Sequence, residues 1–139
     1  MIISDSINTR ENEFIDSLNF FDEWQDKYQF IVEYENKEQL LEKALRKEAY
    51  LVKGCQSKVW LYCKVIEGKL HYYSYSDAPI PKGLAAILCY IYSGSSTKEI
   101  LSFDPQFLLK TALINYLSPL RQRGVKAMEN RFKELAKTV

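Results

Sequence analysis

Two alternating runs of residues constrain the fold of this chain more than any other feature. The first covers residues 59–65 and the second, rich in tyrosine, covers residues 69–76. Alternate residues of a strand point to the same face, and in the first run one face holds Val59, Leu61, Cys63 and Val65. Glu67-Gly68 stands between the runs, and such a short connection is typical of a hairpin turn. The two runs therefore predict a β-hairpin.

A shorter apolar stretch precedes this hairpin. Residues 50–53 have the composition of a short strand, and the loop 54–58 separates them from the first hairpin strand. Strands that follow one another through short connections usually pair as neighbours. The sequence therefore predicts a three-stranded antiparallel sheet.

Apolar residues at helical spacing indicate helices on both sides of the strands. The first predicted helix is capped by Thr9 or Asn12, and the second begins with a capping box formed by Asp22 and Gln25. A third, amphipathic helix is predicted over residues 36–48. Residues 1–8 are predicted to be a polar, flexible tail.

After the strands, an almost entirely apolar helix is predicted over residues 82–92, and such a helix is usually buried. One or two helical turns follow over residues 97–101, and a further helix over residues 106–116. Ser118 is predicted to cap the last helix, with Pro119 at its first position. The expected architecture is α+β: one domain over residues 1–139, with the C-terminal helices packed on one face of the sheet.

Composition excludes several classes of function. Nineteen Lys and Arg residues balance 18 Asp and Glu residues, so there is no basic excess for nucleic acid. The three cysteines cannot all pair and none lies in C-x-x-C spacing, which disfavours a disulfide framework or a metal site. No window has the length and hydrophobicity of a membrane span or a signal peptide. We therefore expect a reduced, cytoplasmic protein that binds no metal, nucleic acid or membrane.

Cys55 is the candidate reactive residue. It lies in a turn beside Gly54, which can adopt a positive φ, whereas Cys63 and Cys89 lie in apolar runs typical of core positions. Lys53 and Lys58 flank Cys55, and nearby cations lower a thiol pKa. The local sequence predicts an accessible, activated thiol, although a turn residue that happens to be cysteine is the alternative.

Three other polar residues have both a functional and a structural interpretation. His71, the only histidine, is the one imidazole available as a base for Cys55, but it also fits an ordinary strand position. Asp77 follows a strand, where it either serves a site or bonds its own loop. Arg121 lies near the start of the last helix, where a cation is disfavoured, so a partner carboxylate or a docking role is suggested.

The stretch Gly54-Cys55-Gln56-Ser57-Lys58-Val59-Trp60 resembles the signature of the SufE/CsdE family of sulfur-acceptor proteins. Four further blocks occur in the family's order. They are Phe21-Asp22-Glu23-Trp24 with Lys27-Tyr28, Ser76-Asp77-Ala78 with Lys82-Gly83-Leu84, Phe103-Asp104, and Leu117-Ser118-Pro119 with Arg121 and Gly124. The resemblance implies a SufE-like fold, which is similar to that of iron–sulfur scaffold proteins.

The resemblance also implies a function and its partners. Such proteins take sulfur from a pyridoxal-phosphate cysteine desulfurase of the SufS/CsdA type, stimulate that enzyme, and pass the sulfur to an iron–sulfur scaffold complex. Cys55 would be the persulfide acceptor, and the chain itself would be no enzyme and would need no cofactor. The residues expected to shape the loop or dock the partner are Gly54, Gln56, Ser57, Asp77, Lys82 and Arg121.

Two other classes of function stay open. A thiol-independent adaptor would regulate a desulfurase without using Cys55. An enzyme with a cysteine nucleophile would pair Cys55 with His71.

Overall fold

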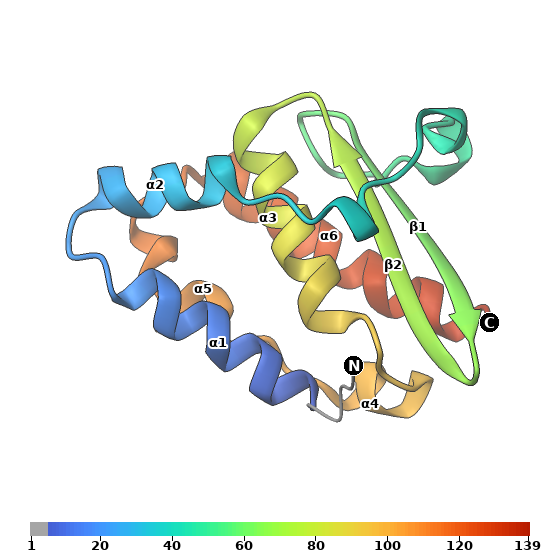
Figure 1. Cartoon of the computed structure of the whole chain (residues 1–139). Helices are drawn as coiled ribbons and strands as arrows, with labels where there is room; N and C mark the ends of the chain where they lie inside the picture. The colour runs from blue at the N-terminus through green and yellow to red at the C-terminus, as the bar shows by residue number, and fades with distance from the viewer. Residues whose placement is uncertain (1–5) are drawn as a thin grey trace.

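An antiparallel hairpin lies along one side of the protein and packs against helices (Figure 1). The computed structural model describes residues 6–139. Strand β1 (Val59–Ile66) pairs with β2 (Lys69–Ser76), as the alternating runs predict. Glu67 and Gly68 connect them with φ values of 52° and 78°. Two successive positive φ angles are what a two-residue type I′ hairpin turn requires, so the local sequence determines this turn.

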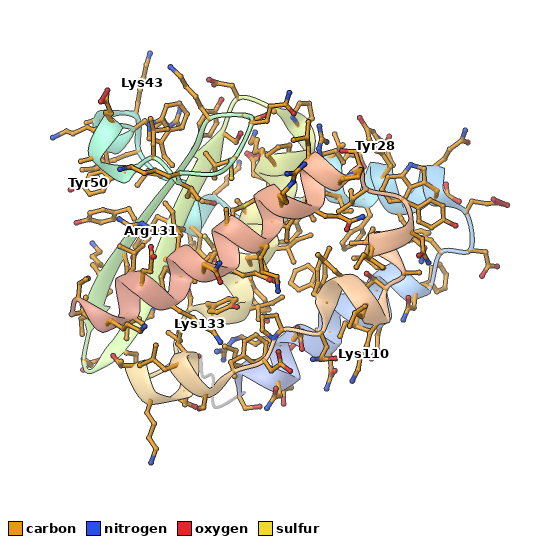
Figure 2. All side chains as sticks on the ribbon, turned by 180° about the vertical axis from the view of Figure 1, so that it is seen from behind. Tyr28, Lys43, Tyr50, Lys110, Arg131 and Lys133 are labelled. Carbon is orange, nitrogen blue, oxygen red and sulfur yellow. The ribbon has the colours of Figure 1, made fainter. Side chains whose placement is uncertain are left out.

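Helices α3 (Pro79–Tyr92) and α6 (Pro119–Lys137) pack against the inner face of the hairpin, and α6 crosses in front of it in Figure 2. Tyr72 of β2 is fully buried, and its ring centroid lies 4.6 Å from that of Phe132 in α6. The Tyr72 hydroxyl donates a hydrogen bond of 2.8 Å to the Phe132 carbonyl oxygen. This face thus combines apolar burial with a satisfied polar group.

The other helices pack on α3, on α6 and on one another. They are α1 (Ile7–Asn19), α2 (Trp24–Glu33), α4 (Thr97–Ser102) and α5 (Phe107–Lys110). Helices α1 and α2 both pack on α3. The approach of α2 is so close that a Cβ on Gly83 would lie 1.9 Å from the carbonyl oxygen of Ile31, so only glycine fits there. No helix within residues 6–139 is both long enough and apolar enough to cross a membrane.

The predicted third strand, residues 50–53, is wrong. The sheet of the described residues has two strands, and Leu51 forms only an isolated bridge with Trp60. The Leu51 N–H does not pair with β1, because it donates to the Glu48 carbonyl in a 3₁₀ turn at Glu48–Tyr50. Val52 N–H alone reaches β1, donating to the Val59 carbonyl at 2.8 Å. The pairing of this segment with β1 therefore ends after a single bridge.

The predicted amphipathic helix over residues 36–48 is also wrong. The segment forms separate 3₁₀ turns at Lys37–Gln39 and Lys43–Leu45. Between them Leu41 N–H donates to the Ser74 carbonyl at 3.0 Å, along the edge of β2. Further on, the Arg46 guanidinium lies 3.5 Å from the ring centroid of Tyr75. These contacts with the hairpin need an irregular path, which a continuous helix would not follow.

The N-terminal helices begin elsewhere than predicted. Helix α1 starts at Ile7, with the Ser6 hydroxyl accepting from Thr9 N–H at 3.1 Å, so the cap is neither Thr9 nor Asn12. Ile7 is buried, which shortens the predicted tail of residues 1–8, and residues 1–5 lie outside the described part. Helix α2 starts at Trp24 without a side-chain cap, so the expected capping box is absent.

Two helices after the hairpin also differ from the prediction. Helix α3 begins at Pro79, three residues early, because proline at the first turn loses no helical hydrogen bond. The segment 106–116 is broken by Ala112, whose φ is 61°. A short 3₁₀ turn at Leu113–Asn115 follows. A single left-handed residue thus divides the predicted helix.

The last helix agrees with the prediction. Helix α6 starts at Pro119, and the Ser118 hydroxyl accepts from Arg121 N–H at 3.2 Å. This cap sets the start of α6, and the backbone of this helix then passes the loop that carries Cys55.

Candidate functional site

Cys55 lies in the loop that joins Leu51 to β1. Gly54 has a φ of 95°, in the region that favours glycine, so the predicted turn is confirmed. The Val52–Val59 hydrogen bond closes the base of the loop. Next to this bond the Ser76 hydroxyl donates to the Lys58 carbonyl at 2.6 Å. The end of the loop that leads into β1 is therefore anchored twice.

Cys55 is half-buried, and its side chain faces α6. The thiol donates a hydrogen bond of 3.4 Å to the carbonyl oxygen of Gly124. Beside it is a cavity of about 30 Å³. The apolar residues that line this cavity include Pro81 and Leu84 of α3, and Leu120, Val125 and Met128 of α6. Helices α3 and α6 thus place an apolar wall next to a loop thiol.

The predicted activation of this thiol by lysines is wrong for the protein as it stands. Lys53 and Lys58 are exposed, with their charges in solvent. Burial raises the pKa of the Cys55 thiol, because a low-dielectric environment disfavours the thiolate. The resting environment therefore favours the protonated thiol over the thiolate.

The other two cysteines are less suited to reaction. Cys89 is completely buried in α3, and burial raises its pKa to about 12. Cys63 is half-buried on β1, and burial raises its pKa to about 11. Their predicted position in apolar surroundings agrees with the structure.

The remaining predicted site residues separate into two groups. Gln56, Ser57 and Arg121 line the cavity together with Cys55. Asp77 is exposed and is not among the lining residues. The Lys82 ammonium lies 5.5 Å from the ring centroid of Tyr75, outside that lining. The structure thus gathers part of the predicted set around the thiol.

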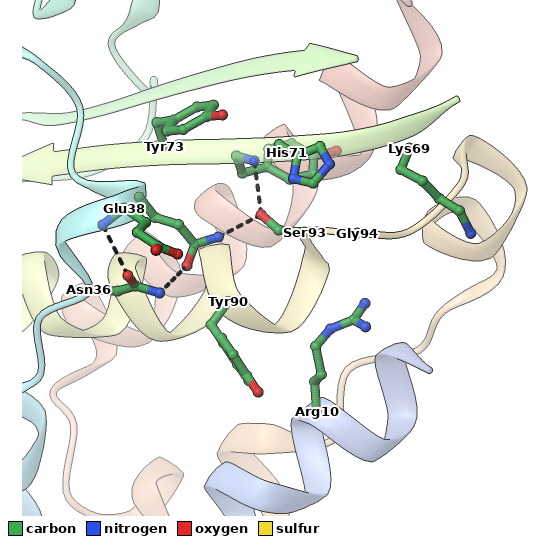
Figure 3. Close-up of a pocket in the computed structure, with 11 residues that line it drawn as sticks. Arg10, Asn36, Glu38, Lys69, His71, Tyr73, Tyr90, Ser93 and Gly94 are labelled. Atoms are coloured by element: carbon green, nitrogen blue, oxygen red, sulfur yellow. Dashed lines mark hydrogen bonds between the residues drawn. The ribbon is translucent and has the colours of Figure 1, made fainter. Parts of the chain in front are cut away.

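His71 lies at a different place. It lines a separate, larger cavity of about 700 Å³, shown in Figure 3 with Arg10, Glu38 and Tyr90. Burial lowers the pKa of His71, and Lys64 lowers it further. Since His71 and Cys55 line different cavities, the structure does not bring them together.

Gly124 is the site residue that the sequence indicated least clearly. It is buried inside α6, where glycine costs about 1 kcal/mol of helix stability relative to alanine. An isolated glycine within a helical pattern often has a packing or functional reason. That signal was present in the sequence, but its connection with Cys55 appears only when the two segments meet in space.

No metal-binding cluster accompanies the site: among residues 6–139, no three His, Cys, Asp or Glu side chains are grouped to hold an ion. The fold and the site define a small α+β protein that presents one sheltered thiol on a loop.

Comparisons with known proteins identify the family. Residues 12–136 match SufE, described as an Fe-S metabolism associated domain. An uncharacterized SufE-like protein of Rhizobium meliloti (strain 1021) is 33% identical over 133 residues, which cover 92% of this chain and 95% of that protein. One of Rhizobium etli (strain ATCC 51251) is 32% identical over 131 residues, covering 91% and 88%. The chain therefore belongs to the SufE family.

A solved structure supports the fold independently. The solution structure of a hypothetical protein from Thermus thermophilus superposes with a TM-score of 0.71. The superposition covers 94% of this chain and 97% of the Thermus thermophilus chain, at 22% sequence identity. At this identity the similarity shows the fold alone.

Proposed function

We propose that Cys55 accepts sulfur from the persulfide of a pyridoxal-phosphate cysteine desulfurase and passes it on to iron–sulfur cluster assembly. The observation that carries this proposal is the position of Cys55, half-buried on a loop beside an apolar cavity. Membership of an Fe-S metabolism associated family supports it. The chain acts as a carrier and activator in the cytoplasm, and the cofactor belongs to the desulfurase.

The transfer step needs no acid–base pair on this chain. The Cys55 thiolate attacks the terminal sulfur of the partner's persulfide, forming one S–S bond while the partner's S–S bond breaks. The partner leaves as a thiolate and takes up a proton, and the Cys55 proton goes to solvent or the partner. The sulfane sulfur moves without a net change in oxidation level.

Docking has to change the surroundings of Cys55. At rest its proton is held by the Gly124 carbonyl, and burial raises the thiol pKa. Withdrawal of the loop from this carbonyl would free the thiol to ionise beside Lys53 and Lys58. We propose that contact with the desulfurase causes this withdrawal, with Arg121 and Asp77 on the docking side.

The two alternative functions have less support. A nucleophilic enzyme would need a base, but His71 lines a different cavity. If the chain were a thiol-independent adaptor, the apolar surroundings of Cys55 would have no explanation.

The experiment that tests the proposal is intact-mass spectrometry after incubation with a cysteine desulfurase and cysteine. Wild type and Cys63→Ser should gain sulfur that a reductant removes, whereas Cys55→Ser should gain none. The Cys63→Ser variant is the matched control, because Cys63 is also half-buried. Stimulation of desulfurase turnover without any mass gain would instead support the thiol-independent adaptor.

A further inference from the structure

The cavity beside Cys55 is small enough to select what it holds. Its volume is about 30 Å³, and a site for one water molecule needs about 10–15 Å³. A sulfur atom is larger than a water molecule, so the space is of the order that one sulfur atom needs. An S–S bond is about 2 Å long, so a terminal sulfur on Cys55, which lines the cavity, can reach this space.

Gly124 keeps this space open. A Cβ on Gly124 would point toward Cys55, at 3.7 Å from Sγ and 4.0 Å from Cα. These are ordinary contact distances, and apart from its own helix and chain neighbours no other described atom lies within 4 Å of that Cβ. Packing therefore tolerates alanine, unlike at Gly83, where a Cβ would overlap the Ile31 carbonyl.

Helix stability does not explain Gly124 either. Glycine inside a helix is less favourable than alanine, and Gly124 has no positive φ that would require it. Gly124 and Cys55 both line the cavity, so the added methyl group of alanine, 3.7 Å from Sγ, would take up part of this space. What glycine provides at this position is empty volume next to Sγ.

The number of sulfur atoms on Cys55 follows from a repeated reaction. The first transfer converts the thiolate into Cys55–S–S⁻, and the donor leaves with one sulfur fewer. A second transfer would form Cys55–S–S–S⁻ by attack of the terminal sulfur on another donor persulfide, with that donor again leaving as a thiolate. The second product needs room for one more sulfur atom.

We propose that this cavity holds a single sulfane sulfur and that Gly124 is the residue that reserves its space, so that the chain carries a persulfide and not a longer polysulfide. This inference rests on the proposed function of Cys55. It assigns Gly124 a role in specificity, acting on the product through the volume beside the reacting atom.

The test uses inorganic polysulfide as the sulfur donor, with every variant built on Cys63→Ser so that Cys55 is the accessible cysteine. Intact-mass spectrometry counts the sulfur atoms per chain, and the rate at which a phosphine reductant removes them measures their shelter. The variants are Gly124→Ala, which fills the cavity, and Val125→Ala, which enlarges it. Asn130→Ala is the matched control, because it also improves α6 but lies outside the cavity lining.

The parent protein and Asn130→Ala should carry one added sulfur that is lost slowly. Gly124→Ala should lose its sulfur at least ten times faster, and Val125→Ala should show a species with two. A main species with two or more sulfurs on the parent, or equal rates of loss for the parent and Gly124→Ala, would overturn the inference. Since no desulfurase takes part, a failure of desulfurase loading overturns the proposed function separately.

Discussion

The thiol of Cys55 donates its hydrogen bond to the Gly124 carbonyl across 3.4 Å, although 69 positions of sequence separate the two residues. A carbonyl oxygen stabilises the protonated thiol and repels the thiolate. The contact therefore favours the protonated form of the Cys55 thiol in the resting protein.

Alkylation of native Cys55 should be slower at pH 7 than alkylation of the same cysteine in the unfolded chain. Burial raises the thiol pKa in the folded state, so the thiolate fraction is smaller there. The folded state then holds the proton more tightly, and stability should fall as pH rises above the pKa of the unfolded thiol. Iodoacetamide labelling followed by peptide mass analysis measures the rate.

Cys63 and Cys89 provide the internal control for this labelling. Burial raises their pKa values to about 11 and about 12, so both should react after Cys55 in the native protein. Labelling of Cys55 faster than a free thiol at pH 7 would contradict the protected resting state.

His71→Ala should leave sulfur loading and desulfurase stimulation within about twofold of wild type. His71 lines the cavity of Figure 3 and not that of Cys55, so it has no proton to move at the thiol. Persulfide formation measured by mass, beside Cys55→Ser as the inactive reference, checks this. A loss of persulfide formation as large as that of Cys55→Ser would instead support an enzyme in which His71 is the base for Cys55.

Arg121→Ala should reduce desulfurase stimulation several-fold without unfolding the protein. The residue lines the Cys55 cavity and is only half-buried, so it can contact both the loop and a partner. Asp77→Ala, in the exposed connection between β2 and α3, should weaken stimulation as well. The measurement is desulfurase turnover against carrier concentration.

Arg123→Ala is the matched control for Arg121→Ala. It removes the same charge from the same helix, but Arg123 is exposed and outside the lining of the cavity. Unchanged stimulation in both Arg121→Ala and Asp77→Ala would remove the docking role.

Glu129→Gln should stabilise the protein at pH 7. Glu129 is buried on α6, and burial raises its pKa more than Lys126, 3.5 Å away, lowers it. Above the pKa of the unfolded residue the folded state must therefore keep a disfavoured carboxylate. The glutamine removes this cost, so the thermal midpoint should rise by a few degrees at pH 7.

The same gain should shrink toward pH 4, where the unfolded residue also becomes protonated. Thermal unfolding at several pH values, with the exposed Glu134→Gln as control, checks the direction. A lower midpoint for Glu129→Gln at pH 7 would show that the contact with Lys126 outweighs burial.

Elements governed by neighbours in sequence were predicted well. The turn at Glu67-Gly68 and the cap at Ser118 depend on backbone angles and on hydrogen bonds within four residues. Cys55 was singled out as a candidate by the same kind of local reasoning, from Gly54 and the loop around it. Each of these signals is complete within a short window of sequence.

Elements governed by distant partners were not predicted. The charged segment 36–48 has a helical pattern, yet it forms 3₁₀ turns because Leu41 bonds Ser74 of β2. The flanking lysines suggested an activated thiol, but contact with α6 and the resulting loss of solvent raise the pKa of Cys55. In both cases a tertiary contact outweighed the local tendency.

The sequence by itself determined the hairpin, the capped last helix and the family resemblance, and it singled out Cys55 as the candidate reactive cysteine. Only the tertiary structure decided that this cysteine is sheltered, and that Gly124 and the apolar residues of α3 and α6 form the space beside it. The physical reason is that turns and caps depend on local geometry, whereas burial and cavity volume depend on which distant segments meet.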